Sequence, residues 1–425
     1  TQRSAWLSSL SKLIAFLFIY LNLMITEQET FGDSRRFPSF PRGEWSDIPE
    51  SDWNDYGWQL RHRLSSLRDL ETRLNLSDEE RAGILFATHS RLAVSITPQF
   101  FTLIDRDDPL CPIRRQVVPH IDEALDDDDE MVDPCGEDAD MPIPGLVHRY
   151  PDRVLMIVTD RCSCYCRHCT RSRGVSGVGS DHLHLDWEPA LNYLRQHTEV
   201  RDVLLSGGDP LLLSDERLDY LLGAMRAIPH IELLRIGSRT PIFMPQRITS
   251  SLCAILRKHA PLFLSIHTNH PRELCAEVKI GLDKLVDAGI PLGNQTVLLR
   301  GINDTAEIQM ELVHQLLMCR VKPYYLYQCD LIKGSSHFRT PLQTGIDIIQ
   351  HLRGYTSGYA VPQYVIDGPG GGGKIPINPD YITKRTTQKT FLKNYLGSPY
   401  SYPEPRIHSD AERQAQMQSI FDQWG

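Results

Sequence analysis

Three cysteines with a fixed spacing are the residues of this sequence that point most directly to chemistry. Cys162, Cys166 and Cys169 form a C-x3-C-x2-C group in the segment TDRCSCYCRHCTRSR (159–173). Thiolates select soft metals and hold iron–sulfur clusters, and three ligands would leave one iron of a four-iron cluster open. Because no second C-x2-C or H-x3-H pair lies nearby, structural zinc is less favoured. A trio that includes Cys164 can also be written, but we interpret Cys164 as a packing residue.

A glycine-rich segment that ends in a lysine is the second candidate. The segment VIDGPGGGGKIPINP (365–379) contains Gly370 to Gly373, followed directly by Lys374. A Walker A loop would need Ser or Thr after the lysine, and here Ile375 follows. An amine at the end of a flexible glycine loop suits a Schiff base with a carbonyl cofactor. A plain turn with a surface lysine is the alternative.

A short polar turn is the third candidate, and its members are Ser206, Gly207, Gly208 and Asp209. Glycines allow close backbone approach, and a carboxylate can pair with an ammonium group. Such a turn is common and by itself is weak evidence for a binding site. It becomes good evidence because it follows the next predicted strand after the cysteine group.

The elements that must position these residues form a repeating pattern from about residue 150 onward. Amphipathic segments such as 214–228 separate the apolar strands, which implies parallel βα units. In barrels of such units, chemistry sits at the carboxyl ends of the strands, where the cysteine group and the Ser206 turn fall. We therefore predict an α/β fold with a partial (β/α)6 barrel, whose strands are 154–159, 202–206, 233–237, 262–266, 294–299 and 322–327.

The chain is divided into four regions by these patterns. We interpret 1–25 as upstream sequence outside the working protein; its apolar run is shorter than the roughly 20 residues that span a bilayer, and an anchor or a buried helix are the alternatives. Residues 26–148 are predicted to be mainly helical, 149–340 to form the barrel, and 341–425 to carry the glycine loop as a C-terminal extension.

Within the N-terminal region, leucines at helical spacing predict helix over much of 54–105, and Ser77 to Glu80 fits a capping box. Three tryptophans, Trp45, Trp53 and Trp58, are expected to pack onto a neighbouring surface. We interpret the acidic stretch 122–140 as a solvated linker rather than a metal site.

Composition excludes several classes of protein. The chain has 425 residues, 41% of them hydrophobic and 23% charged, which is ordinary for a globular protein and not for a disordered, collagen-like or integral-membrane chain. A net charge of −9 and a pI near 6.0 argue against a nucleic-acid partner. Ten cysteines are too few for a disulfide scaffold.

The cysteine group resembles that of the radical S-adenosylmethionine superfamily, and the Ser206 turn resembles its motif for the amino group of S-adenosylmethionine. His168 would lie beside the adenine. The chain is similar to lysine 2,3-aminomutases over roughly 45–385. The matching segments are HRYPDRVL (148–155), VRDVLLSGGDPLL (200–212), IGSRTP (236–241), PLGNQTVLLRGIND (291–304), YQCDL (327–331), HFRTP (337–341) and LRGYTSGYAVP (352–362).

The resemblance implies three cofactors. Cys162, Cys166 and Cys169 would hold a [4Fe-4S] cluster that binds S-adenosylmethionine, and Lys374 would form the internal aldimine with pyridoxal 5′-phosphate. The residues implied as further contacts to pyridoxal phosphate or S-adenosylmethionine are Arg149, Tyr150, Arg153 and Gln295. Family members with a C-terminal cysteine group bind structural zinc, and because no cysteine follows Cys329 we expect this chain to lack that site.

The substrate pocket is also implied by the resemblance. Arg171 matches the position that takes the α-carboxylate, and a guanidinium reads a carboxylate bidentately. Asp330 and Asp367 match the positions that receive the distal group. Two carboxylates demand a cation, which fits lysine and not glutamate; the related glutamate 2,3-aminomutase has a lysine and an amide instead. Arginine remains an alternative substrate, because its guanidinium group can also pair with two carboxylates.

The expected function is the interconversion of L-lysine and β-lysine by an isomerase that uses a 5′-deoxyadenosyl radical. Its partners would be free lysine and an external electron donor such as flavodoxin or ferredoxin. We expect a cytoplasmic homo-oligomer, a dimer or tetramer, without nucleic-acid or membrane partners. The alternatives are a mutase for arginine or another amino acid, a mutase for protein-bound lysine, another radical enzyme such as a methylthiotransferase, and a zinc-binding interaction module.

Overall fold

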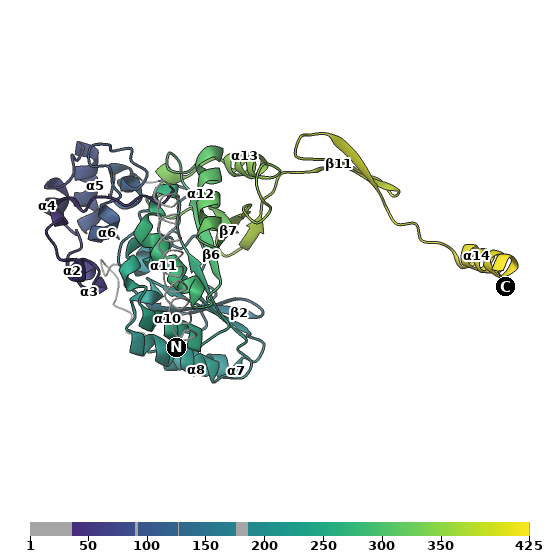
Figure 1. The fold of residues 1–425 in the computed structure, drawn as a ribbon, viewed down its shortest axis with the longest axis horizontal. Helices are drawn as coiled ribbons and strands as arrows, with labels where there is room; N and C mark the ends of the chain where they lie inside the picture. The colour runs from purple at the N-terminus through teal and green to yellow at the C-terminus, as the bar shows by residue number, and fades with distance from the viewer. Residues whose placement is uncertain (1–35, 90–91, 126, 176–185, 425) are drawn as a thin grey trace, which may run out of the picture.

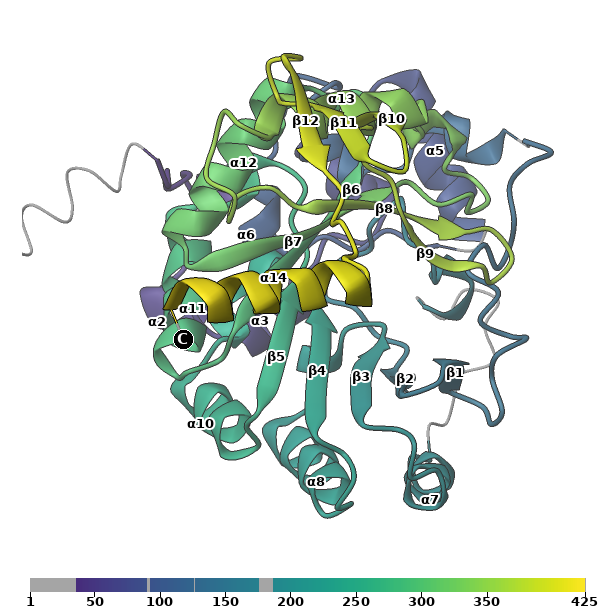
Figure 2. The same ribbon diagram turned by 90° about the vertical axis from the view of Figure 1, so that its right-hand side faces the viewer.

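A curved β-sheet with helices on its outer side forms the centre of the protein (Figures 1 and 2). The computed structural model describes residues 36–89, 92–125, 127–175 and 186–424, so the upstream segment predicted at 1–25 lies outside it. Strands β2 to β8 pair in parallel in sequence order, and β1 and β9 add antiparallel edges. The strands are β1 (Leu146–Tyr150), β2 (Arg153–Thr159), β3 (Asp202–Gly207), β4 (Leu233–Ser238), β5 (Leu262–Ile266), β6 (Leu292–Leu298), β7 (Val321–Gln328), β8 (Gln363–Gly368) and β9 (Gly373–Pro376).

The predicted partial (β/α) barrel is confirmed, and it has one more parallel strand than expected. Strands β2 to β7 match the six predicted segments to within two residues at each end, and β8 pairs in parallel with β7 after the helix α13 (Leu342–Leu352). The sheet thus continues past residue 340, where we drew the end of the barrel. Because β1 and β9 end the strand order without pairing to each other, the barrel is open.

The barrel helices bury one apolar stripe each against the sheet. In α8, which falls in the amphipathic segment predicted at 214–228, the buried residues are Leu218, Leu221, Leu222 and Met225. The helices are α7 (Glu188–Gln196), α8 (Asp215–Arg226), α9 (Thr240–Phe243), α10 (Ser250–Lys258), α11 (Ala276–Asp287), α12 (Ala306–Met318) and α13 (Leu342–Leu352). Burial alternates along the strands, as in β2 and β6, so every second residue faces the barrel interior.

The N-terminal region consists of short helices: α2 (Glu50–Trp53), α3 (Tyr56–Arg61), α4 (Leu67–Glu71), α5 (Asp78–His89) and α6 (Pro98–Phe101). The continuous helix suggested by the leucine spacing is wrong between α3 and α4, because Leu64 forms an isolated bridge with Ile96 and Ser66 caps a new helix. The capping box at Ser77 is confirmed: the Glu80 N–H donates to Ser77 Oγ at 3.1 Å and the Ser77 N–H donates to Glu80 Oε2 at 2.8 Å.

The three N-terminal tryptophans are buried, as predicted. The ring centroids of Trp45 and Trp53 lie 6.1 Å apart, and those of Trp53 and Trp58 lie 5.7 Å apart. This aromatic group belongs to the same hydrophobic core as the barrel strands. The N-terminal region is therefore packed onto the barrel and is not a separate module.

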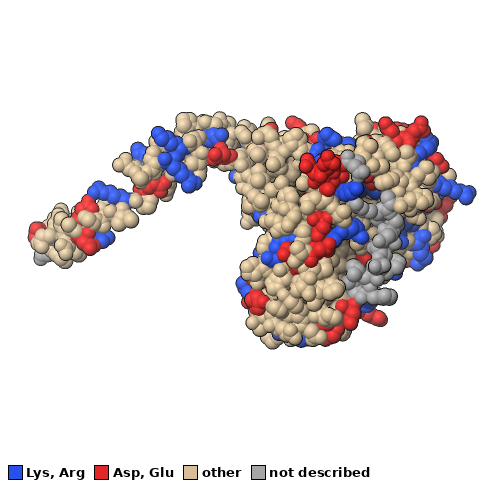
Figure 3. All heavy atoms as spheres, turned by 180° about the vertical axis from the view of Figure 1, so that it is seen from behind, with Lys and Arg blue, Asp and Glu red and all other residues tan. Residues whose placement is uncertain are grey.

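An arm extends from the barrel at the C-terminal end of the chain (Figure 1). It consists of a three-stranded antiparallel sheet and one helix, and none of the helix residues is buried. Acidic and basic side chains are interspersed on the face seen in Figure 3. No helix in the described ranges is long and apolar enough to cross a membrane. The elements of the arm are β10 (Ile382–Arg385), β11 (Lys389–Lys393), β12 (Pro399–Pro403) and α14 (Asp410–Trp424).

Candidate active site

One cavity of about 830 Å³ lies inside the barrel, and every residue that the sequence predicted for the site lines it. The cysteine loop after β2, the turn after β3, the ends of β6 to β8 and the glycine loop all reach it. These residues are Arg149, Tyr150, Arg153, Cys162, Cys166, His168, Cys169, Arg171, Ser206, Gly207, Gly208, Asp209, Gln295, Asp330, Asp367 and Lys374.

The cysteine loop is held in place by the N-terminal region. The backbone N–H of Tyr165 donates to the carbonyl of Ser95 at 3.0 Å, and that of Arg167 donates to the carbonyl of Gln116 at 2.9 Å. Arg63 Nη1 donates to the carbonyl of Cys162 at 3.1 Å. The N-terminal region therefore fixes the backbone from which the three thiols project.

The three thiols fit a multi-iron cluster better than a single zinc ion. Sulfurs bound to one tetrahedral zinc with bonds of about 2.3 Å would lie about 3.8 Å apart. In the described part of the chain, the sulfur atoms of Cys162, Cys166 and Cys169 do not all lie within 4.8 Å of one another. They are therefore spread more widely than the ligands of one zinc ion. Burial raises the pKa of the Cys169 thiol to about 11 and also raises the pKa values of Cys162 and Cys166. A bound metal ion would favour the deprotonated form of these thiols.

Cys164 and His168 are the buried neighbours of the cysteine group. Cys164 is 1% exposed and packs in the hydrophobic core, and it also borders the cavity. His168 is also buried, and its Nδ1 has no hydrogen-bond partner in the described part of the chain. A buried nitrogen without a partner on the cavity wall is available to a ligand.

The glycine turn after β3 packs against the cysteine loop. The N–H of Gly208 donates to the Thr159 carbonyl at 2.6 Å, and that of Asp209 donates to the Arg161 carbonyl at 2.7 Å. A Cβ on Gly208 would lie 2.3 Å from the Arg161 oxygen. The close approach that requires glycine is therefore to the neighbouring backbone.

The role predicted for Asp209 needs revision. Its Oδ1 accepts hydrogen bonds from the Ser238 hydroxyl at 2.6 Å and the Leu211 N–H at 3.1 Å, and its Oδ2 accepts from the N–H groups of Arg239 and Thr240 at 2.8 Å each. These four bonds use the lone pairs of the carboxylate. Asp209 therefore fixes the turn after β4, and a direct contact with an ammonium group is not supported.

Lys374 lies on β9 directly opposite Asp367 on β8. Its Nζ lies 3.1 Å from Asp367 Oδ1 and 5.1 Å from the centre of the Tyr327 ring. Its backbone N–H donates to the Tyr150 hydroxyl at 3.0 Å. Gly373 has φ +71°, and a Cβ there would lie 2.9 Å from that hydroxyl, so glycine is required before the lysine.

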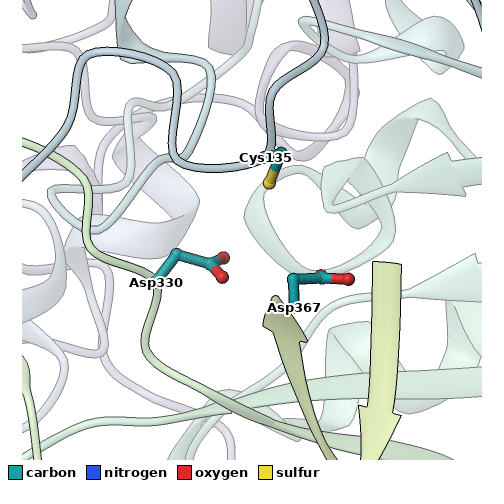
Figure 4. Close-up of side chains that lie close together, drawn as sticks. All are labelled: Cys135, Asp330 and Asp367. Atoms are coloured by element: carbon teal, nitrogen blue, oxygen red, sulfur yellow. The ribbon is translucent and has the colours of Figure 1, made fainter. Parts of the chain in front are cut away.

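The side chains of Asp330, Asp367 and Cys135 lie close together at the cavity wall (Figure 4). Their ligand atoms lie within 4.8 Å of one another. No hydrogen bond to the Asp330 carboxylate is formed by the described residues. Burial, and then the charge of Asp367, raise the pKa of Asp330 to about 7. Burial and the same two acids raise the pKa of the Cys135 thiol to about 12. Two carboxylates in this setting favour a cationic partner.

Arg171 reaches the cavity already paired. Its Nη2 and Nε contact the carboxylate of Glu137 at 2.5 and 3.1 Å, and its Nη1 donates to the Ser206 hydroxyl at 3.0 Å. Although burial would raise the pKa of Glu137, Arg171 holds it below its usual range. The Ser206 hydroxyl is thus engaged with the arginine.

The acidic stretch is not the solvated linker that the sequence suggested. Cys135 and Glu137 line the cavity, and Arg149 and Arg173 bind the same segment through Asp140 (2.6 Å) and Asp138 (2.5 Å). Runs of acids are usually solvated, but here arginines from β1 and the cysteine loop supply the counter-charges. The match between the acids of this stretch and the arginines that follow it in the sequence is the signal that the sequence analysis missed.

The remaining predicted contacts line the same wall of the cavity. The Arg153 guanidinium lies 4.0 Å from the centre of the Tyr150 ring, and Gln295 projects inward from β6. Sequence reasoning also missed Arg239, whose Nη1 lies 2.9 Å from Cys166 Sγ and whose Nη2 pairs with Glu273 at 3.0 Å. Its segment was noted only as part of a resemblance.

The sequence matches known proteins over most of its length. It is 49% identical to the L-lysine 2,3-aminomutase of Fusobacterium nucleatum, over 88% of each chain, and 48% identical to that of Clostridium subterminale, over 88% of each chain. It is 41% identical to the glutamate 2,3-aminomutase of Clostridioides difficile, over 82% of each chain. A family model described as Lysine-2,3-aminomutase matches residues 349–424.

Solved structures give a weaker likeness. Coproporphyrinogen III oxidase from Escherichia coli, described as a radical SAM enzyme, has a TM-score of 0.34 and 15% identity over 48% of this chain and 52% of its own. Because the chain is 47–49% identical to curated relatives over most of their length, it belongs to the lysine 2,3-aminomutase family.

Proposed function

We propose that the protein is an isomerase that interconverts L-lysine and β-lysine. The observation that carries this proposal is the meeting, in one cavity, of three cysteines, a lysine on a glycine loop and two carboxylates. The names of the relatives at 47–49% identity support the same activity.

The residues around the cavity fit the cofactors that the activity needs. Cys162, Cys166 and Cys169 would hold a [4Fe-4S] cluster, with His168 near the adenine of S-adenosylmethionine. Lys374 would carry pyridoxal 5′-phosphate, with Arg149, Tyr150, Arg153 and Gln295 as candidate contacts. When bound, these groups supply a 5′-deoxyadenosyl radical that removes hydrogen from Cβ and a carbonyl that holds the migrating nitrogen.

The side chains of the protein would bind and orient the substrate. Arg171 would hold the α-carboxylate, and Asp330 with Asp367 would hold the ε-ammonium group. Lys374 would hold the cofactor, and Asp367, whose Oδ1 lies 3.1 Å from Lys374 Nζ, would orient this amine. The barrel and the acidic segment enclose the reacting atoms and limit access of water.

The charge at the distal end of the cavity favours a basic substrate. Asp330 and Asp367 would repel the γ-carboxylate of glutamate and attract an ammonium or guanidinium group. Arginine is therefore the main competitor. A protein-bound lysine is less favoured, because Arg171 would then lack a free α-carboxylate.

We also propose that the protein works in the cytoplasm as a homo-oligomer with an external reductant such as flavodoxin or ferredoxin. The arm supports the oligomer, because α14 exposes apolar side chains at helical spacing: Met417, Ile420, Phe421 and Trp424. The cytoplasm would supply the reductant and the cofactors.

An anaerobic assay of the reconstituted protein with dithionite and S-adenosylmethionine tests the proposal. L-Lysine, L-arginine and L-glutamate are supplied separately, and the β-amino acids are quantified. We expect β-lysine alone, and none from Lys374→Ala. Turnover of glutamate in preference to lysine would contradict the proposal.

A further inference from the structure

Glu137 is buried against the arginine that we expect to read the substrate carboxylate. Its side chain is 9% exposed, and both of its oxygens contact the Nε–Nη2 edge of Arg171. Such side-on pairing of a carboxylate with a guanidinium fixes the plane of the guanidinium as well as its position.

A count of donors on Arg171 shows what this pairing leaves available. A guanidinium has five N–H groups. Glu137 takes the Nε–H and one N–H of Nη2, and the Ser206 hydroxyl takes one N–H of Nη1. With these partners from the described residues, one N–H remains on each Nη nitrogen. A second carboxylate can still bind these two donors.

Glu137 is itself held firmly. Its segment is fixed by the ion pairs of Arg149 with Asp140 and of Arg173 with Asp133. The Gly370 N–H donates to the Pro134 carbonyl at 2.9 Å, which ties the segment to the glycine loop. Glu137 thus has a fixed place relative to both the cysteine loop and the loop that carries Lys374.

We infer that Glu137 is a positioning residue that holds Arg171 ready to bind the α-carboxylate of the substrate, an inference that rests on the proposed function. Without Glu137, the long arginine side chain would sample other rotamers, and substrate binding would have to restrict it. Glu137 acts on the carboxylate end of the substrate only. Its loss therefore weakens ligands that have an α-carboxylate and spares those that lack one.

The test compares L-lysine with cadaverine, which is lysine without its carboxylate. Dissociation constants are read from the visible absorbance of the pyridoxal-loaded protein, and KM and kcat for lysine are measured in parallel. The variants are Glu137→Gln and, as a control in the same segment, Asp138→Asn, whose exposed carboxylate pairs with Arg173. Arg171→Gln is made alone and combined with Glu137→Gln.

We expect Glu137→Gln to weaken lysine binding by about 10- to 100-fold, mainly in KM, with cadaverine changed by less than about threefold. Asp138→Asn should leave both ligands unchanged. The double variant should bind lysine no more weakly than Arg171→Gln alone, because Glu137 acts through Arg171. If Glu137→Gln alone does not fold because it leaves the Arg171 charge buried without its partner, the comparison of the double variant with Arg171→Gln tests the inference. The double variant lacks both charges and so has no unpaired buried charge.

Equal weakening of lysine and cadaverine by Glu137→Gln would overturn the inference, as would a further loss of lysine affinity in the double variant. A wild-type protein that holds pyridoxal phosphate and gives no response to lysine would contradict the proposed function itself. A wild-type response that Glu137→Gln reproduces unchanged would contradict the inference alone.

Discussion

Replacing Asp330 with Asn should stabilise the protein without substrate and weaken its binding of lysine. The Asp330 carboxylate lies in the cavity beside Asp367, and its pKa is raised to about 7 by burial and by that neighbouring charge. An acid whose pKa is higher in the folded than in the unfolded state loses stability as the pH rises from about 4 to about 7. Above pH 7 the full penalty is present.

The size of this effect follows from the pKa. A rise from 3.8 to about 7 corresponds to about 4 kcal/mol at most. Water that reaches the partly exposed carboxylate lowers this to about 1–3 kcal/mol. Asn has nearly the same shape and no charge. Asp330→Asn should therefore be more stable by about 1–3 kcal/mol at pH 8, with most of the gain lost by pH 4.5.

Chemical denaturation of both proteins in the same cofactor state, with and without lysine, measures this. Lysine should raise the denaturation midpoint of the wild type much more than that of Asp330→Asn. The difference in stability between the two proteins should therefore shrink or change sign when lysine is present. A variant that is less stable than the wild type at pH 8 without lysine would refute the reasoning, and so would a stability difference that is the same at pH 4.5 and pH 8.

Three further changes probe the other parts of the site. Ala at any one cysteine of the C-x3-C-x2-C group should abolish activity and lose most of the iron, whereas Cys164→Ala should keep both; an iron-free Cys164→Ala protein would overturn the ligand assignment. Lys374→Ala should lose the borohydride-trappable pyridoxal adduct with its iron content unchanged, and an adduct that maps to Lys333 would contradict the role of Lys374. Gly208→Ala should lower the free energy of unfolding by about 1–3 kcal/mol, because its Cβ would lie 2.3 Å from the Arg161 carbonyl oxygen; an unchanged denaturation midpoint would show that the loop can relax.

The barrel and the position of the site could be predicted from the sequence. Apolar strands alternating with amphipathic helices define parallel βα units, and such units place the ends of their strands on one face. The cysteine group and the Ser206 turn were therefore expected on one face, and the family resemblance implied that Lys374 joins them; Cys162, Ser206 and Lys374 all line the cavity. Local patterns such as the capping box at Ser77 were equally readable.

Partners of charged residues could not be predicted from the sequence, because they depend on tertiary contacts. The acidic stretch is predicted to be solvated, but the structure places Arg149, Arg171 and Arg173 beside it as ion-pair partners. From the sequence, Asp209 is predicted to bind a ligand, whereas in the structure its carboxylate accepts four hydrogen bonds from backbone N–H groups and a hydroxyl. In both cases the pattern gave the residue types and not what surrounds them.

The most direct test of the proposed activity is to follow the migrating nitrogen. L-Lysine labelled with ¹⁵N at the α-amino group and ¹³C at C3 is incubated anaerobically with the reconstituted, reduced protein. If the amino group moves from C2 to C3 within one molecule, the product shows a one-bond ¹³C–¹⁵N coupling at C3, and unlabelled ammonium in the buffer does not dilute the ¹⁵N. Recovered lysine without that coupling, under conditions in which the protein holds its cluster and pyridoxal phosphate, would contradict the assignment.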